Sequence, residues 1–156
     1  MPDHGPPLRV LFVDNDPMFL ALLKPMIRSF DSGIEVATLD DPNKVLEAVV
    51  SGRYDCVVVD YYMPRVSGVS LIKRIKAARS VPCILYTGMS IEDVLEEAEE
   101  AGVDAVICKV DDPGQYVQFI RLIRDTVDKH SSALARESLY TQTAIPVDPG
   151  ASSNQP

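Results

Sequence analysis

The sequence predicts an α/β domain in which helices cover both faces of a parallel, doubly wound sheet. Five short apolar runs alternate along the chain with five segments whose apolar residues recur at helical spacing. Strands that alternate with helices in this way usually pair in parallel. The chain has 156 residues, 46% of them hydrophobic, which suits a single domain with its own core.

The apolar runs define the predicted strands, which are Arg9–Val13, Ile34–Leu39, Cys56–Val59, Cys83–Tyr86 and Ala105–Cys108. The third run is almost continuously apolar from Val57 to Val59, which is typical of a strand between two layers of helices. We therefore expect this strand to be buried on both sides.

The helical segments begin near Pro17, Pro42, Val69, Ile91 and Pro113 and are expected to run for about three or four turns each. Three of these helices are preceded by an aspartate, namely Asp16, Asp41 and Asp112. An aspartate at the N-cap followed by proline at the first helical position favours a helix start. Ser90 and Asp93 form a start resembling a capping box for the fourth helix.

Pro25 conflicts with the first predicted helix. It falls inside the helical segment, where proline lacks the backbone donor that the helix needs. We expect this helix to be kinked or split at Pro25.

The composition changes after Lys129 to a stretch rich in Ser, Ala, Thr, Gln and Pro. We therefore predict one domain over residues 8–129 and a C-terminal tail over residues 130–156 that is disordered or partly helical. The tail is too short for a DNA-binding output domain.

The three cysteines, Cys56, Cys83 and Cys108, all lie in predicted strands, where a reduced thiol acts as a small apolar side chain. A metal or redox site would need closer cysteine spacing. The two histidines, His4 and His130, lie near the ends of the region expected to be ordered. We expect all three cysteines in the core.

The formal net charge of −8 argues against a nucleic-acid partner, since no basic stripe is available to displace counterions from phosphates. No apolar run approaches the ~20 residues of a membrane span, and Met1 to Pro7 lacks the apolar centre of a signal peptide. These features predict a cytoplasmic protein with no membrane partner.

Polar residues that suit phosphoryl chemistry follow the predicted strands. Ligands of open parallel sheets bind outside the carboxyl ends of the strands, at the point where the winding direction reverses. The residues there are Asp14, Asn15 and Asp16 after the first strand, Asp60 after the third, Thr87 after the fourth and Lys109 after the fifth. Converging carboxylates without His or Cys favour Mg²⁺ as a bound cation.

This pattern resembles the response-regulator receiver family, the CheY-like phosphoacceptors of two-component signalling. The most specific segment runs from Val57 through Asp60 to Pro64 and is followed by Gly68, and Leu85 to Gly88 and Ile107 to Lys109 come in the matching order. The resemblance covers roughly Leu8 to Lys129. It implies a flavodoxin-like sheet with strand order 2-1-3-4-5 and five helices.

The resemblance also implies how Mg²⁺ would be held. The ligands would be the carboxylate of Asp60, the side chain of Asn15 and the backbone carbonyl of Tyr62, with Asp14 acting through water. The cation would bridge these ligands to the incoming phosphoryl oxygens.

In the same way, the resemblance implies a role for each reacting group. Asp60 would be the phosphorylated nucleophile. Lys109 would pair with Asp60 before the reaction and with the phosphoryl group afterwards, and Thr87 would donate to another phosphoryl oxygen. Such a chain is not an enzyme beyond its own phosphorylation and dephosphorylation.

The sequence departs from the family at several positions. Asn15 stands where a second acid is usual, so we expect weaker Mg²⁺ binding. Val110 replaces a proline that is usually cis, so we expect a trans bond there. Val106 replaces an aromatic switch residue, so a switch linked to Thr87 would use Tyr86 or be absent.

Tyr62 and Met89 occupy the positions that tune water access to the phosphoryl group in this family. Both side chains are bulky, which predicts a long-lived phosphorylated state. The Tyr86-Thr87-Gly88 ending and the turn from Lys109 to Pro113 also resemble archaeal receivers attached to sensor kinases.

Two other functions fit parts of the pattern. In haloacid-dehalogenase-type phosphatases the nucleophile would be Asp14, but Met18 stands where that family has Thr and the segment from Asp60 to Gly68 would have no role. A pseudo-receiver that binds proteins without being phosphorylated would tolerate Asn15 and Val110.

The resemblance implies a sensor histidine kinase or a phosphotransfer protein as the phosphodonor. It implies a downstream protein, or a second copy of the chain, on the face formed by the fourth helix, fifth strand and fifth helix. The fourth helix is strongly acidic, from Glu92 to Glu100. This predicts either a solvated surface or a docking surface for a basic partner.

Overall fold

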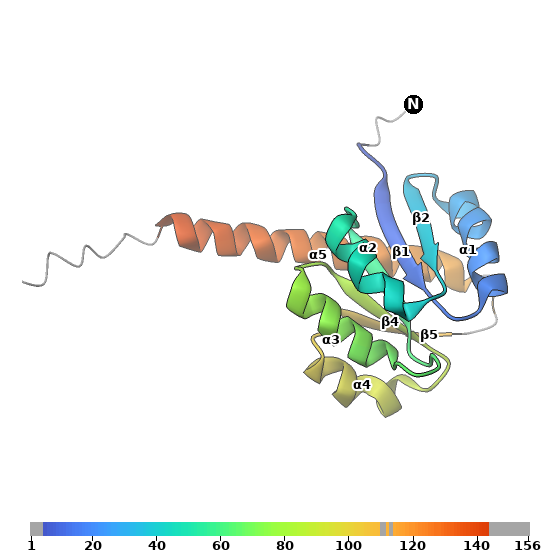
Figure 1. The fold of residues 1–156 in the computed structure, drawn as a ribbon. Helices are drawn as coiled ribbons and strands as arrows, with labels where there is room; N and C mark the ends of the chain where they lie inside the picture. Colours follow the sequence, from blue (N-terminus) through green and yellow to red (C-terminus); the bar gives the residue numbers. More distant parts are fainter. Residues whose placement is uncertain (1–4, 110–111, 113, 144–156) are drawn as a thin grey trace, which may run out of the picture.

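The structure is a computed structural model that describes residues 5–109, 112 and 114–143. These residues form β1 (Leu8–Val13), α1 (Pro17–Phe30), β2 (Ile34–Leu39), the 3-10 helix η1 (Pro42–Lys44), α2 (Val45–Ser51), β3 (Cys56–Asp60), α3 (Gly68–Ala78), β4 (Cys83–Thr87), α4 (Ile91–Glu100), β5 (Ala105–Cys108) and α5 (Gln115–Thr143). Helices and strands alternate along the chain, as predicted (Figure 1).

The five strands form one parallel sheet in the order β2-β1-β3-β4-β5. This confirms the predicted fold class and strand order. The chain adds strands on one side of β1 and then on the other, so the winding direction reverses between β1 and β3. The carboxyl ends of these two strands therefore border the crevice where doubly wound sheets bind ligands.

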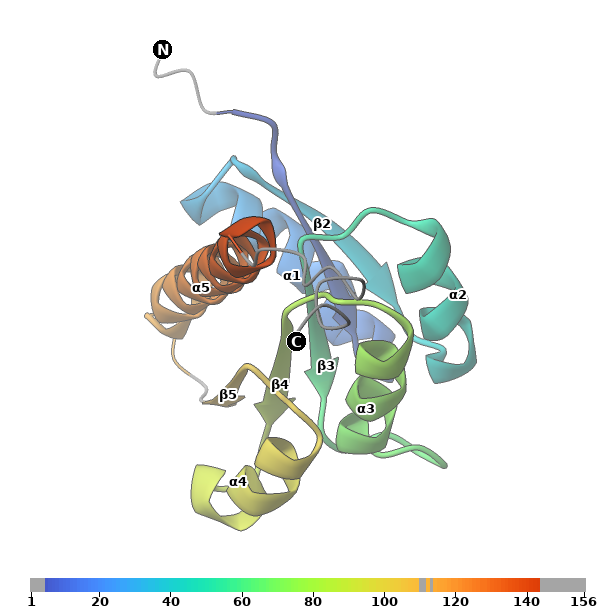
Figure 2. The ribbon, with the colours of Figure 1, turned by 90° about the vertical axis from the view of Figure 1, so that its left-hand side faces the viewer.

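Each face of the sheet has its own apolar core, and Figure 2 shows the two helical layers. On one face α1 and α5 contribute side chains such as Leu23 and Ile123, and on the other α2, α3 and α4 contribute side chains such as Val49, Ile72 and Val94. Every residue of β3 is buried, which confirms the prediction for the third strand.

Two of the predicted acidic N-caps are present. Asp16 accepts hydrogen bonds from the backbone N–H groups of Met18 and Phe19, and Asp41 accepts one from Asn43. Ser90 is also an N-cap residue, but its hydroxyl donates to the side chain of Asp93 at 2.8 Å and makes no capping bond to the backbone. The helix starts where predicted, without the reciprocal bonds of a capping box.

Pro25 does not split α1, which is one helix from Pro17 to Phe30. The expectation of a split was wrong, because the buried side chains of Leu20, Leu23 and Ile27 hold both halves of the helix against the sheet. The lost backbone bond lies on the exposed side, since Pro25 itself is exposed.

Two helix lengths differ from the predicted three or four turns. The second helical segment is a 3-10 turn followed by only seven α-helical residues, and it ends at Gly52. The fifth is 29 residues long. It begins at Gln115, and Asp112 accepts a hydrogen bond from Gly114 in the turn before it. Pro113, Val110 and Asp111 lie outside the described residues, so the expected trans bond at Val110 is untested.

The helix α5 continues without a break past Lys129, where we placed the domain boundary. His130 lies within this helix rather than near the end of the ordered chain. Residues 131–137 of the helix are all exposed, and Figure 1 shows this part extending beyond the sheet. Residues 144–156 of the predicted tail, and His4, lie outside the described residues.

Cys56 and Cys83 are buried in the core as predicted, and burial raises the pKa of both thiols, that of Cys83 to about 12. Both are therefore protonated at neutral pH. Cys108 is only half-buried, since β5 is an edge strand, so the core prediction was wrong for it. None of the helices in the described part of the chain is both long and apolar enough to cross a membrane.

Candidate functional site

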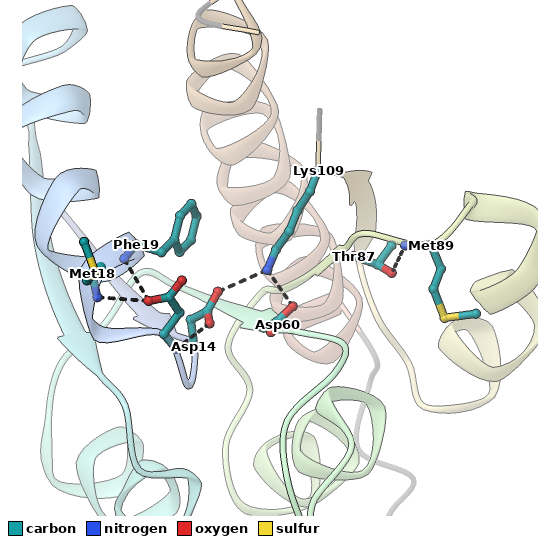
Figure 3. Close-up of polar contacts among 8 residues, drawn as sticks. Asp14, Met18, Phe19, Asp60, Thr87, Met89 and Lys109 are labelled. Carbon is teal, nitrogen blue, oxygen red and sulfur yellow. Dashed lines mark hydrogen bonds and ion pairs between the residues drawn. The ribbon is translucent and has the colours of Figure 1, made fainter. Parts of the chain in front are cut away.

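Three of the predicted site residues meet at the carboxyl end of the sheet. The Lys109 ammonium lies 2.9 Å from Oδ1 of Asp60 and 3.1 Å from Oδ2 of Asp14. Figure 3 shows Lys109 reaching down between the two carboxylates. These residues follow or end β1, β3 and β5, so the parallel sheet brings together side chains that lie up to 95 positions apart in the sequence.

Both carboxylates are almost completely buried, with Asp14 3% and Asp60 7% exposed. Burial raises the pKa of Asp60 above its ordinary value, against the opposing effect of the Lys109 ammonium. The nearby charge of Asp14 raises it further, and a hydrogen bond from the Tyr62 backbone lowers it. Asp60 is thus a carboxylate in a poorly solvated site with one cation beside it.

Lys109 is the cation of this cluster, and its ammonium is half-buried. Burial alone would lower the pKa of Lys109, but the hydrogen bonds and charges of Asp60 and Asp14 outweigh it and raise the pKa above the ordinary value. Lys109 therefore remains charged at neutral pH. This is the pairing with Asp60 that the resemblance implied before reaction.

Asp14 and its neighbour Asp16 have different roles in the loop after β1. Oδ1 of Asp14 accepts a hydrogen bond from the backbone N–H of Asp16 at 2.9 Å, while Oδ2 faces Lys109. Asp16 is exposed and caps α1 through Met18 and Phe19. Its carboxylate is therefore used to begin the helix, and Asp14 supplies the negative charge within the site.

Thr87 ends β4 and is fully buried. Its hydroxyl oxygen accepts a hydrogen bond from the backbone N–H of Met89 at 2.9 Å (Figure 3). Between them Gly88 is exposed, with open space around the position of a Cβ. The Thr87 hydroxyl is thus held by the loop that leads to α4.

Tyr62, Met89 and Asn15 lie at the rim of the site. The exposed fractions of Tyr62 and Met89 are 78% and 44%. Asn15 is exposed and lines a surface cavity of about 340 Å³ together with residues of the loops after β2 and β3, including Asp41 and Arg65. Asn15 therefore faces solvent, whereas its neighbour Asp14 is buried.

Tyr86 and Val106, the two residues considered for a switch linked to Thr87, pack on opposite faces of the sheet. In β4 the side chains alternate, so Leu85 packs in the core under α2, α3 and α4, while Tyr86 packs in the core under α1 and α5. Val106 is half-buried against the first of these cores. Tyr86 therefore faces the opposite side of the sheet from Thr87. That a switch at Thr87 uses Tyr86 or is absent stays a prediction.

Gly68, the last residue of the motif around Asp60, begins α3 directly behind the site. A Cβ at this position would lie 2.1 Å from the carbonyl oxygen of Asp60. The Gly68 backbone N–H also donates to the carbonyl of Tyr61 at 2.9 Å. The close approach of α3 to the end of β3 therefore requires glycine at this position.

The donor set fits a hard cation such as Mg²⁺. The two carboxylates and one ammonium leave one negative charge uncompensated in a buried site, and the groups around it offer oxygen ligands. Within the described residues no group of three or more His, Cys, Asp or Glu side chains is arranged for a metal. Any cation bound here must therefore also use the Asn15 amide, backbone carbonyls or water.

The structure is therefore a doubly wound α/β domain with paired carboxylates, a lysine and a threonine at the carboxyl ends of its strands, where such sheets bind ligands. The chain matches the model of the response regulator receiver domain over residues 10–121. It belongs to this family, as the sequence resemblance indicated. The match decides against the haloacid-dehalogenase reading, in which Asp14 would be the nucleophile.

Curated relatives place the chain among two-component regulators. It is 38% identical over 142 residues to the transcriptional regulatory protein PrrA of Mycobacterium tuberculosis, covering 90% of this chain and 58% of that protein. It is 28% identical over 106 residues to the chemotaxis protein CheY of Pseudomonas aeruginosa, covering 65% and 84%. The chain thus spans little more than half the length of PrrA.

Similar solved structures agree on the fold. A CheY-like receiver domain from Methanospirillum hungatei matches with a TM-score of 0.71 at 22% identity, covering 81% of this chain and 98% of that one. The receiver domain of sensor histidine kinase PA1611 from Pseudomonas aeruginosa, which has magnesium coordinated in its active site cleft, matches with a TM-score of 0.66 at 22% identity, covering 78% and 98%.

The sequence did not identify the aromatic rings beside Lys109. Its ammonium lies 4.9 Å from the ring centroid of Tyr86 and 5.2 Å from that of Phe19. Tyr86 was singled out for another reason, and Phe19 was not considered. The only local signal was an aromatic residue immediately before Thr87 and another in the first turn of α1, and neither pattern indicates a contact with a lysine.

Proposed function

We propose that this receiver domain accepts a phosphoryl group on the carboxylate of Asp60. The phosphodonor is a phosphohistidine of a sensor histidine kinase or phosphotransfer protein, or a small acyl phosphate. The observation that carries the proposal is the Lys109 ammonium, which lies 2.9 Å from Asp60 and is also held by the buried carboxylate of Asp14.

In the proposed reaction a carboxylate oxygen of Asp60 attacks phosphorus, and the bond between phosphorus and the donor's histidine nitrogen breaks. The electron pair of that bond stays on the histidine. The Lys109 ammonium then pairs with the phosphoryl oxygens, because the aspartyl phosphate carries more negative charge than the carboxylate it replaces. Asp14 keeps Lys109 in place throughout.

The residues that would hold Mg²⁺ are Asp60, Asp14, the Asn15 side chain and the Tyr62 backbone carbonyl. Bound there, Mg²⁺ supplies positive charge that neutralises the phosphoryl oxygens. Thr87 would donate its hydroxyl to a phosphoryl oxygen after giving up its present contact with the N–H of Met89. This change would pull the loop before α4 inward.

The signal would leave through the face of α4, β5 and α5. Ile91, Leu95 and Val117 on this face expose apolar side chains, which favours a downstream protein or a second copy as the partner. The acidic residues of α4 would favour a partner with a basic patch. We propose a cytoplasmic protein that acts through binding and performs no further catalysis.

The test is phosphorylation in vitro. The protein is incubated with Mg²⁺ and acetyl phosphate, and its intact mass is compared with that of Asp60→Asn treated in the same way. We expect one added phosphoryl group in the wild type and none in the variant. Beryllofluoride should perturb the wild-type NMR spectrum only when Mg²⁺ is present.

A pseudo-receiver is the alternative that Asn15 favours, because a neutral amide replaces one metal-binding acid. In that case neither acetyl phosphate nor beryllofluoride would change the protein at saturating Mg²⁺. Added mass on the Asp60→Asn variant would instead show that a different residue is the acceptor.

The phosphorylated state is expected to be long-lived, because Tyr62 and Met89 are bulky residues at the rim of the site. Tyr62 is mainly exposed and Met89 is partly exposed, so both side chains would have to fold over the phosphoryl group to exclude water. The double variant Tyr62→Asn/Met89→Glu should therefore lose its phosphoryl group about tenfold faster. An equal half-life, measured from the decay of the phosphorylated mass, would contradict this.

A further inference from the structure

Lys109 is held on a second side by aromatic rings that the proposed reaction does not use. The rings of Phe19 and Tyr86 are stacked, with centroids 5.7 Å apart and planes inclined by 22°. The ammonium of Lys109 lies over both, at 5.2 and 4.9 Å from their centroids. Figure 3 shows the Phe19 side chain beside that of Lys109, on the α1 side of the site.

These rings are fixed by elements other than the one that carries Lys109. Phe19 comes from the first turn of α1 and Tyr86 from the buried strand β4. Behind Tyr86 lies Phe119 of α5, stacked at 5.1 Å and 16°, and Phe119 in turn contacts Phe12 edge to face at 5.7 Å. The rings beside Lys109 are therefore anchored in the core between α1 and α5.

The strand that precedes Lys109 does little to fix the position of its side chain. It follows β5, a four-residue edge strand in which every residue is half-buried. A flexible lysine at such a position would lose side-chain entropy when it reaches the two carboxylates. An aromatic surface that attracts the ammonium offsets this loss, because the negative ring face favours a cation in a poorly solvated site.

Tyr86 is suited to this role. Burial, followed by the charges of nearby groups, raises the pKa of its hydroxyl to about 12, so the ring stays neutral at physiological pH. A neutral ring keeps the face that attracts a cation, and does not compete with Asp60 as an anion. The exposed fraction of Tyr86 is 8%, so water does not screen this contact well.

We propose that Tyr86 and Phe19 are positioning residues whose stacked rings hold the Lys109 ammonium where it reaches both Asp60 and Asp14. This inference rests on the proposed function, since the reaction that benefits is phosphoryl transfer to Asp60. The rings touch no reacting atom. They act by limiting where the ammonium can lie.

The test compares three variants of the ring column. Tyr86→Leu removes the ring face and keeps apolar bulk, Tyr86→Phe keeps the ring without the hydroxyl, and Phe12→Leu removes a ring that contacts Phe119 farther along the column. The rate of phosphorylation by acetyl phosphate with Mg²⁺ is measured for each, together with the free energy of unfolding. Phe19→Leu replaces Tyr86→Leu if the latter does not fold.

We expect Tyr86→Leu to slow phosphorylation about three- to tenfold, as the loss of a partly desolvated cation–π contact predicts. Tyr86→Phe should retain the wild-type rate. Phe12→Leu should be destabilised without a comparable loss of rate. A wild-type rate in Tyr86→Leu, or an equal loss in Phe12→Leu, would overturn the proposal.

A second measurement does not depend on phosphorylation. In protein labelled with ¹³C-lysine, the ε-CH₂ resonance of Lys109, assigned by its loss in Lys109→Met, should be shifted upfield by the rings in the wild type and in Tyr86→Phe. The shift should be lost in Tyr86→Leu. An unshifted resonance in the wild type refutes the ring contact, whereas failure of acetyl phosphate to modify a protein with this shift refutes only the proposed function.

Discussion

At the scale of single residues, the site is defined by charge balance. Asp14 and Asp60 are buried carboxylates that share one ammonium, that of Lys109. A buried cluster with one uncompensated negative charge attracts cations and positions its lysine, but it reduces stability. Asn15 lies next to Asp14 in the chain, and its amide offers an oxygen without adding a charge.

Asn15→Asp is expected to tighten Mg²⁺ binding by about tenfold, because one more negative charge close to a divalent cation contributes on the order of 1 to 2 kcal/mol even with solvent screening. Isothermal titration calorimetry of the wild type and the variant measures this. Asn43→Asp is the matched control, since Asn43 is exposed in the same surface cavity but belongs to η1. Equal affinities for Asn15→Asp and the wild type, or equal tightening by the control, would exclude Asn15 as a ligand.

Asp60→Asn is expected to raise the free energy of unfolding at neutral pH, because burial raises the pKa of Asp60 and its charge is therefore unfavourable in the folded protein. A raised folded-state pKa contributes stability at low pH that is lost as the pH rises through that pKa. The advantage of the variant should therefore shrink at acidic pH, where Asp60 itself takes up a proton. Urea unfolding at both pH values measures the difference, and a variant less stable than the wild type at neutral pH would contradict it.

At the scale of the elements, the site depends on how closely α3 approaches the end of β3. Gly68 begins α3, and its missing side chain leaves room for the carbonyl of Asp60. Ser67 is the N-cap of this helix, and its hydroxyl accepts a hydrogen bond from the backbone N–H of Ser70. Any change that pushes α3 away also moves the backbone that carries Asp60.

Gly68→Ala is expected to destabilise the protein by about 3 kcal/mol, because its Cβ would lie 2.1 Å from a backbone oxygen that cannot move without displacing Asp60. Chemical denaturation measures the loss. Gly88→Ala is the matched control, since a Cβ there meets open space, and it should change stability by less than about 1 kcal/mol. Similar losses in both variants would show that glycine flexibility, rather than close packing, explains the effect.

It is the first half of the long helix α5 that packs against the core. Phe119, Ile120 and Ile123 lie in the core, and Thr126 is the last buried residue of the helix among those whose side chains are described. Beyond it His130 makes one exposed contact with Ser80, at 3.4 Å. The second half of α5 therefore contributes little burial to the fold.

At the scale of the whole molecule, we propose that residues 8–129 form the cooperative folding unit. Truncation after Lys129 is expected to change the free energy of unfolding by less than about 1 kcal/mol, whereas Ile123→Ala should cost about 2 to 5 kcal/mol through the cavity it leaves. Thermal or urea unfolding of the truncated and full chains tests this. A loss as large as that of Ile123→Ala would place the domain boundary farther along the helix.

The residues next to the site belong to two different apolar cores, one on each face of the sheet. Thr87 and Val106 face the side of α2, α3 and α4, whereas Tyr86, Phe19 and Phe119 lie on the side of α1 and α5. The ammonium of Lys109 contacts the second group through the ring of Tyr86. It also forms an ion pair with the carboxylate of Asp60. The sheet between the two cores keeps these contacts apart.

The kind and order of the elements, and most residues at the candidate site, could be predicted from the amino-acid sequence. Periodicity, N-cap residues and strand-end polar residues depend on neighbours in the chain, so Asp16 before Pro17 and Asp60 after Val59 could be read without coordinates. Local patterns were less reliable where packing overrides propensity, as at Pro25 and in the length of α5.

Which side chains contact one another became clear only from the folded arrangement. That Lys109 lies between Asp14 and Asp60, that Tyr86 turns away from Thr87, and that a Cβ on Gly68 would collide with Asp60 all depend on contacts across the sheet. Strand alternation assigns a side chain to one face or the other, but the packing of helices on that face determines what it touches. The physical reason is that such contacts join residues far apart in the chain, and no local pattern records the distance between them.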